Sequence, residues 1–164
     1  MAHSLDLHRD LQYSAQKAYR QLAENGLPLA RVHTMPVCYD VVDLMIGQLA
    51  TLGHDAEHEV RPTTTGQHSY VRLPSRVTHD VIADPTWQQF LPRKHVDAPK
   101  LLIGSRGKLI TQARSFGVPV RMLTLWEPVG AVLDLSDLKN RADDADAAAD
   151  RAFEAGKWEA FAKR

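Results

Sequence analysis

Three residues of this chain have the side chains that nucleophilic acyl chemistry needs: Cys38, His68 and Asp84. A cysteine attacks a carbonyl carbon as its thiolate, a histidine accepts and returns the proton, and a carboxylate orients the imidazole ring. Cys38 is the single cysteine of the chain, so it cannot form an internal disulfide. The three residues are far apart in the sequence, and the fold must bring them together if they form one site.

The stretch from Gln67 to Trp87 predicts a β-hairpin that brings His68 close to Asp84. Two alternating runs, residues 69–73 and 80–83, are separated by proline and serine, which favour a bend. If residue 73 pairs with residue 79, then residue 68 lies opposite residue 84, although a register shifted by one or two residues fits the same pattern. The hairpin therefore predicts a histidine beside a carboxylate, the arrangement that orients a general base.

Cys38 lies at the start of a predicted helix, residues 38–52. Pro36 precedes the first turn and Gly53 follows the last. The free N–H groups of a helix N-terminus favour a thiolate, and they can also stabilise the oxyanion that forms when the thiolate attacks a carbonyl. The backbone N–H of Cys38 is the expected first oxyanion donor. Side-chain donors could come from polar residues that otherwise read as ordinary loop positions: His33, Thr34 and Gln67.

The remaining pattern predicts an α+β fold in a single domain spanning residues 1–164. Helices are expected over residues 5–25, 106–116 and about 142–162, with Ser4 and Ser105 capping the first two. Further strands are expected over residues 56–61, 100–103, 120–126 and 131–135. This order predicts a mainly antiparallel sheet packed against helices, with the last helix peripheral.

Composition and charge argue against several classes of function. Basic and acidic residues number 20 each, and no basic stripe interleaves with aromatic residues, so no nucleic-acid partner is expected. No apolar run approaches the ~20 residues that span a bilayer, and the N-terminus lacks the pattern of a signal peptide. We expect a cytoplasmic protein with no membrane partner; export by a dedicated secretion machine would leave the same pattern.

Three segments resemble the papain-like and transglutaminase-like superfamily: Val37-Cys38-Tyr39-Asp40, His68-Ser69-Tyr70-Val71 and Ala83-Asp84-Pro85-Thr86-Trp87. In that superfamily the nucleophilic cysteine begins a helix packed on a sheet, and histidine and aspartate come from adjacent strands. The Asp-Pro-Thr-Trp segment is the most specific of the three. The cysteine segment departs from the family pattern, because neither an aromatic residue nor a Gly-x-Cys precedes Cys38.

The resemblance implies a papain/transglutaminase-like core and a thiol-dependent acyl-transfer enzyme acting on an amide. Cys38 would form a thioester, His68 would transfer the proton and Asp84 would hold the imidazole. Water would then give hydrolysis or deamidation, and an amine would give transamidation. The small size resembles bacterial glutamine deamidases and acyltransferases of this superfamily. The implied partner is an amide- or thioester-bearing substrate, such as a protein or a carrier-bound acyl group, with no cofactor and no metal.

Three alternatives remain open from the sequence. A cysteine peptidase-like hydrolase would use the same three residues. A metal hydrolase could draw on the many histidines and a neighbouring carboxylate: His54, His58, His68, His79 and Asp80. In a non-enzymatic interaction module, Cys38 would be a small core residue and the contact between His68 and Asp84 a structural hydrogen bond. Trp87 and Trp126 are expected to be core or rim aromatics.

Overall fold

The computed structural model describes residues 2–63, 66–76, 79–92 and 97–128, and describes only the backbone of residues 2–5. The strand expected over residues 131–135 and the helix expected over residues 142–162 lie outside these residues. In chain order the elements, with η denoting a 3₁₀ helix, are α1 (Ala2–Glu24), η1 (Val32–Thr34), α2 (Cys38–Thr51), β1 (Glu57–Thr63), β2 (Gly66–Leu73), β3 (Val81–Asp84), η2 (Trp87–Phe90), β4 (Leu102–Gly104), α3 (Arg106–Ser115), α4 (Val120–Leu123) and η3 (Thr124–Trp126).

The described strands form one four-stranded antiparallel sheet in the order β1-β2-β3-β4. Each strand pairs with the next strand of the chain. This confirms the predicted α+β class and the antiparallel sheet. The strands expected over residues 56–61 and 100–103 are present, with ends that differ by one or two residues.

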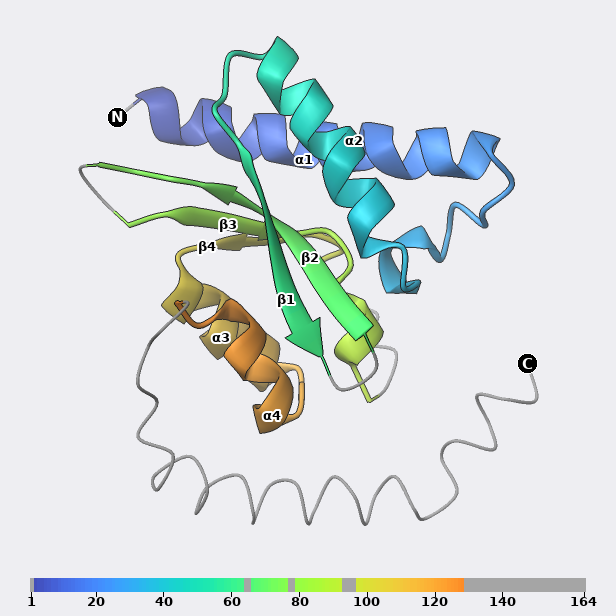
Figure 1. The fold of residues 1–164 in the computed structure, drawn as a ribbon, viewed down its shortest axis with the longest axis vertical. Helices are drawn as coiled ribbons and strands as arrows, with labels where there is room; N and C mark the ends of the chain where they lie inside the picture. The colour runs from blue at the N-terminus through green and yellow to red at the C-terminus, as the bar shows by residue number, and fades with distance from the viewer. Residues whose placement is uncertain (1, 64–65, 77–78, 93–96, 129–164) are drawn as a thin grey trace.

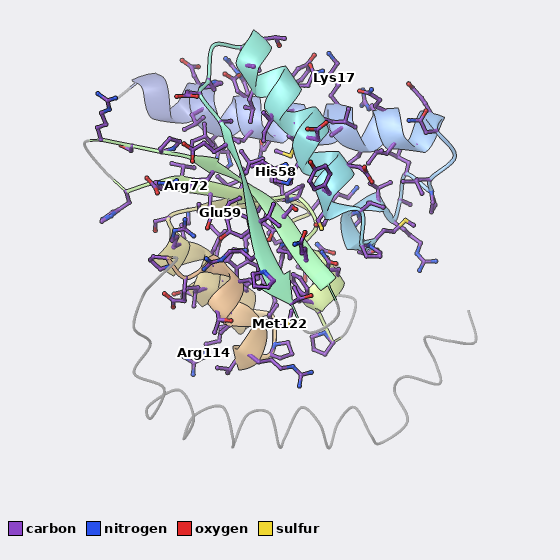
Figure 2. The ribbon with its side chains drawn as sticks, viewed as in Figure 1. Lys17, His58, Glu59, Arg72, Arg114 and Met122 are labelled. Carbon is purple, nitrogen blue, oxygen red and sulfur yellow. The ribbon has the colours of Figure 1, made fainter. Side chains whose placement is uncertain are left out.

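Helices cover both faces of the sheet (Figure 1). α1 and α2 cross one another on one face, and α3 and α4 lie against the other. Figure 2 shows Lys17 of α1 and Met122 of α4 on these opposite sides. Because side chains alternate along a strand, β2 contributes Val71 and Leu73 to the core beneath α1 and α2, and Tyr70 to the core beneath α3.

The two N-terminal helices follow their apolar periodicity. The residues of α1 that recur at helical spacing are buried against α2 and the sheet: Leu11, Ala15, Ala18, Tyr19 and Leu22. α2 buries Val41, Val42, Met45 and Leu49 in the same core. α1 begins at Ala2, so Ser4 lies within the helix, and the prediction that Ser4 caps it is wrong. Ser105 does cap α3, where its side chain accepts the N–H of Lys108.

The predicted hairpin is present, but its register is displaced by two residues. Leu73 pairs with Val81 and Val71 with Ala83, whereas the prediction paired residue 73 with residue 79. The connection is longer than expected because Asp80 belongs to it. Its carboxylate accepts the N–H of Ser75 at 3.1 Å and the Nε–H of Arg72 at 2.8 Å, which closes the loop ahead of β3.

The strand expected over residues 120–126 is wrong, because these residues form α4 and η3. Val118, Leu123 and Trp126 are buried in the core beneath α3. Pro119 precedes the first turn of α4, a place where its fixed φ suits a helix start. A short apolar run fits a strand and a buried helix equally well by periodicity, and here tertiary packing selects the helix.

None of the helices in the described part of the chain is both long and apolar enough to cross a bilayer.

Candidate active site

His68 and Asp84 form a hydrogen-bonded pair between neighbouring strands. Nε2 of His68 lies 2.6 Å from Oδ2 of Asp84, and both side chains are buried, with 1% and 0% of their surface exposed. The register displaced by two residues keeps both residues on the same face, because side chains alternate with period two. The predicted contact therefore forms as a diagonal one, since the observed pairing places Asp84 across from Tyr70 and not from His68.

The Asp84 carboxylate receives two further hydrogen bonds that hold its plane. The backbone N–H of Thr86 donates to Oδ1 at 3.1 Å, and the indole N–H of Trp126 donates to Oδ2 at 2.9 Å. On the other side of β3, the hydroxyl of Tyr19 donates to the carbonyl oxygen of Pro85 at 2.6 Å. Hydrogen bonds to both oxygens of the Asp84 carboxylate, and one to the carbonyl oxygen of Pro85 directly after it, therefore hold the carboxylate in place.

Cys38 is the first residue of α2, as its place after Pro36 predicts. The preceding residue, Val37, makes no side-chain hydrogen bond to the N–H groups of the first turn. Cys38 as a whole is 6% exposed, and its Sγ lies 3.8 Å from the carbonyl oxygen of Gln67. α2 therefore delivers the sulfur to the start of β2, where His68 lies.

The thiol and the imidazole shift one another's pKa values in opposite directions. Burial alone would raise the pKa of Cys38, but its hydrogen bond with His68, the charge of that imidazole and the N–H of Ser69 together lower it. Burial alone would lower the pKa of His68, but the charge of Asp84 and its hydrogen bond, together with Cys38, raise it to about 9. Both shifts favour a thiolate beside an imidazolium.

The two ring nitrogens of His68 have different partners. Because Nε2 is bound to Asp84, Nδ1 is the nitrogen available to exchange a proton with the sulfur. The side chain of Gln89 also faces Nδ1, with its Nε2 at 3.2 Å, and the same amide donates to the carbonyl oxygen of Thr86 at 3.0 Å. Phe90 packs edge-on against the imidazole, with ring centroids 4.7 Å apart. η2 thus supplies two residues that hold the ring, and neither was predicted as part of the site.

The three predicted side-chain oxyanion donors differ in their placement. Gln67 lies next to the thiol, and its backbone carbonyl is the group that contacts Sγ. The hydroxyl of Thr34 donates to the carbonyl oxygen of Arg31 at 2.8 Å, within its own turn. His33 is buried, with its ring 6.3 Å from that of Tyr19. None of these three placements puts a side-chain donor against Sγ, and the backbone N–H of Cys38 stays the predicted first oxyanion donor.

The histidines of the alternative metal site have separate partners. His54 lies 2.8 Å from Asp10, and His58 stacks on Tyr39 with ring centroids 4.5 Å apart. Within the residues that the structure describes, no three histidine, cysteine or acidic side chains are grouped so that they could hold a metal ion.

A cleft of about 860 Å³ lies away from the thiol. Charged residues line it, among them Glu57, Glu59, Arg72, Asp80 and Arg106, whereas Cys38, His68 and Asp84 do not.

Comparison of the chain with protein-family models, with curated proteins and with solved structures finds no match.

Proposed function

We propose that this protein is a cysteine-nucleophile enzyme that transfers an acyl group from an amide by way of a thioester. The observation that carries the proposal is the buried pair of His68 and Asp84, 2.6 Å apart, beside a thiol at a helix start. The lowered pKa of Cys38 and the raised pKa of His68 supply the charged pair that such a reaction needs. The order of cysteine on a helix and histidine and aspartate on adjacent strands supports a papain/transglutaminase-like core.

In the proposed reaction, the proton of Cys38 moves to Nδ1 of His68, and Sγ bonds to the carbonyl carbon of the amide. The oxyanion that forms is stabilised by N–H groups at the start of α2. The C–N bond breaks, the leaving amine takes the proton from His68, and a thioester remains on Cys38. Water or a second amine then attacks the thioester, with His68 accepting its proton, and the thiol is regenerated. Asp84 holds the imidazole throughout.

The proposal is tested by trapping the thioester. The full chain is incubated with amide donors, such as glutamine peptides, and with small thioester donors, and its intact mass is measured. We expect the mass of one acyl group on the wild-type chain, located on Cys38 by peptide mapping, and none on Cys38→Ala. His68→Ala should form the adduct from a thioester donor about 10²–10⁴-fold more slowly, the usual contribution of a general base. Turnover of any amide substrate by Cys38→Ala would contradict the proposal.

A non-enzymatic interaction module is the second candidate, because Cys38 is only 6% exposed and the three site residues do not line the cleft of about 860 Å³. In that case Cys38 is a core residue, and the pair of His68 and Asp84 is structural. The rate of alkylation by iodoacetamide separates the two functions. An enzyme's thiolate reacts in the native protein near neutral pH, whereas a core thiol reacts only after unfolding.

A further inference from the structure

Trp126 contacts the candidate site from a distant part of the chain. Its ring is fully buried beneath α3, and its indole N–H donates to Oδ2 of Asp84 at 2.9 Å. This is the same oxygen that binds Nε2 of His68 at 2.6 Å. The position of the indole therefore helps to decide where that oxygen lies with respect to the imidazole.

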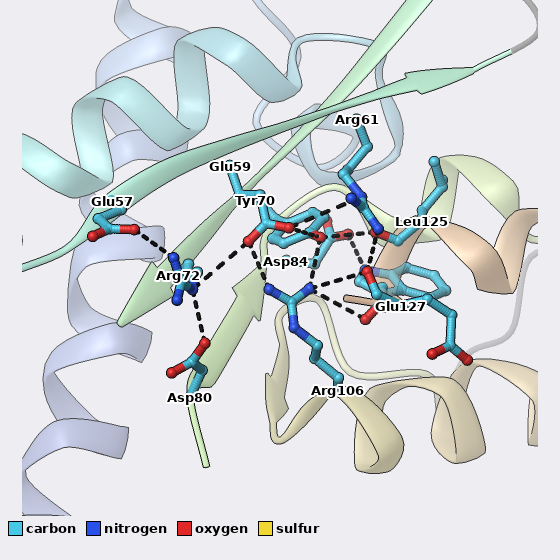
Figure 3. A network of polar contacts seen from close by, with 11 residues as sticks. Glu57, Glu59, Arg61, Tyr70, Arg72, Asp80, Asp84, Arg106, Leu125 and Glu127 are labelled. Carbon is cyan, nitrogen blue, oxygen red and sulfur yellow. Dashed lines mark hydrogen bonds and ion pairs between the residues drawn. The ribbon is translucent and has the colours of Figure 1, made fainter. Parts of the chain in front are cut away.

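The main chain around Trp126 is held by polar side chains of the sheet and α3 (Figure 3). Tyr70 donates to the carbonyl oxygen of Leu125 at 2.8 Å, and Nε of Arg61 donates to the same oxygen at 3.1 Å. Arg61 also donates through Nη2 to the carbonyl oxygen of Glu127. We call the three donors, Arg61, Tyr70 and Arg106, the carbonyl-binding cluster.

Arg106 completes the cluster from α3. Its Nη1 donates to the carbonyl oxygen of Trp126 at 3.3 Å and to the hydroxyl of Tyr70 at 3.1 Å. The carbonyl oxygens of three successive residues, 125–127, are thus bound by side chains outside η3. Such an arrangement fixes the backbone of η3, and with it the direction of the indole N–H.

Glu59 holds the donors of the carbonyl-binding cluster in place. Its carboxylate lies 2.8 Å from the hydroxyl of Tyr70, which shares its one proton between this carboxylate and the carbonyl oxygen of Leu125. It also accepts an N–H of Arg106 at 2.7 Å and lies 3.9 Å from Arg61. Burial alone would raise the pKa of Glu59, but these partners together lower it. A single partly buried carboxylate therefore organises all three donors.

We propose that Trp126 is a positioning residue of the site formed by Cys38, His68 and Asp84, and that the carbonyl-binding cluster sets its place. The inference rests on the proposed thiol function. Trp126 acts through Asp84: it keeps Oδ2 aligned with Nε2 of His68, so that the imidazolium stabilises the thiolate of Cys38. No contact between Trp126 and a substrate is needed for this role.

The test measures the alkylation rate of Cys38 by iodoacetamide as a function of pH in the full chain. Trp126→Phe keeps a ring in the core but removes the N–H. Trp87→Phe is the matched control, because Trp87 is equally buried in the same core and its N–H donates instead to the carbonyl oxygen of Pro99 at 2.8 Å. Both variants should lower the melting temperature, since each removes one hydrogen bond to a buried acceptor.

We expect the pH midpoint of alkylation to rise in Trp126→Phe, with the rate at neutral pH falling by about tenfold, the effect of one hydrogen bond to a charged group. In Trp87→Phe the rate should stay within about twofold of the wild type. Tyr70→Phe, which removes one carbonyl contact, should move the midpoint in the same direction as Trp126→Phe. If Trp126→Phe does not fold, Tyr70→Phe decides the question.

His68→Ala separates the failure of this inference from the failure of the proposed function. It should raise the midpoint of alkylation to that of an ordinary thiol. If it does so while Trp126→Phe and Tyr70→Phe behave like Trp87→Phe, the role of Trp126 is wrong and the thiol function stands. If His68→Ala leaves the profile unchanged, the pairing of thiol and imidazole is wrong, and both proposals fall.

Discussion

At the scale of single residues, the chemistry depends on two opposing effects on the pKa of His68: burial lowers it, and the charge of Asp84 raises it. Burial alone favours the neutral imidazole over the imidazolium, but the carboxylate at 2.6 Å reverses this preference. The same change favours the thiolate form of Cys38, because an imidazolium stabilises a neighbouring thiolate. Asp84 therefore affects the nucleophile through the imidazole that it holds.

The raised pKa of His68 predicts how the stability of the fold depends on pH. The folded-state pKa of about 9 exceeds the ordinary value of 6.5, so the pair contributes stability that is fully present below pH 6.5 and is lost as the pH rises through 9. In Cys38→Ala the thiol no longer titrates and Asp84 alone keeps the pKa of His68 raised, so we expect its free energy of unfolding to fall as the pH rises above 6.5. Urea denaturation at several pH values measures it.

The control for this dependence is the double variant Cys38→Ala, His68→Ala. It lacks the imidazole, so its free energy of unfolding should change less between pH 6.5 and pH 9 than that of Cys38→Ala. Equal slopes in the two proteins would show that His68 does not titrate with the raised pKa.

At the scale of elements, the α2 start and the pairing of β2 with β3 create the site. Both follow from local sequence: Pro36 ahead of the helix, apolar residues at helical spacing, and alternation on the strands. The alternation also explains why an error of two residues in the register leaves the contact of His68 with Asp84 intact. The exact register could not be predicted, because it depends on Asp80 closing the loop through Arg72 and Ser75.

Replacing Asp80 with alanine should therefore weaken the hairpin without changing the site. We expect a loss of about 0.5–1 kcal/mol in the free energy of unfolding, because the ion pair with Arg72 is partly exposed and solvent screens it. The pH midpoint of Cys38 alkylation should stay unchanged, since His68 and Asp84 keep their shared face. A changed midpoint would mean that the loop sets the register at the site itself.

At the scale of the whole molecule, the sheet separates the apolar core beneath α1 and α2 from the apolar core beneath α3. On the side of α3, polar side chains of the sheet and of α3 bind the main chain of residues 125–127 (Figure 3). The contacts of Trp126 and Gln89 with the site could not be predicted from sequence. The indole lies 42 residues from Asp84 in the chain, and the run that contains it fits a strand by periodicity. Gln89 belongs to a polar segment in which no local pattern indicates where its side chain points. Such contacts arise from tertiary packing alone.

Glu59 is expected to be the most important carboxylate for stability outside the site. Glu59→Gln removes the charge that pairs with partly buried Arg106, and should lower the free energy of unfolding by about 1–3 kcal/mol. Glu57→Gln is the matched control, because Glu57 is half exposed and pairs with Arg72, and should cost less than about 1 kcal/mol. Equal losses in the two variants would contradict this role for Glu59.

The lowered pKa of Glu59 predicts how the effect of Glu59→Gln on the free energy of unfolding depends on pH. Its contribution is present above the ordinary carboxyl pKa of 4.5 and is lost as the pH falls through the lower folded-state value. The difference in free energy of unfolding between the wild type and Glu59→Gln should therefore be smaller at acidic pH than at pH 7. Denaturation of both proteins at the two pH values measures it.

Period-two alternation along β3 also limits where this chain can gain or lose residues over evolution. The printed pairing of β2 with β3 ends at Leu73 and Val81, so an insertion between these two residues lengthens the connection and leaves the orientation of Asp84 unchanged. Deletion of one residue between Val81 and Asp84 would turn the carboxylate toward the core beneath α1 and α2, a hydrocarbon environment that penalises an unpaired charge. Natural relatives of this protein should therefore differ in length ahead of Val81 and keep a constant spacing from there to the aspartate.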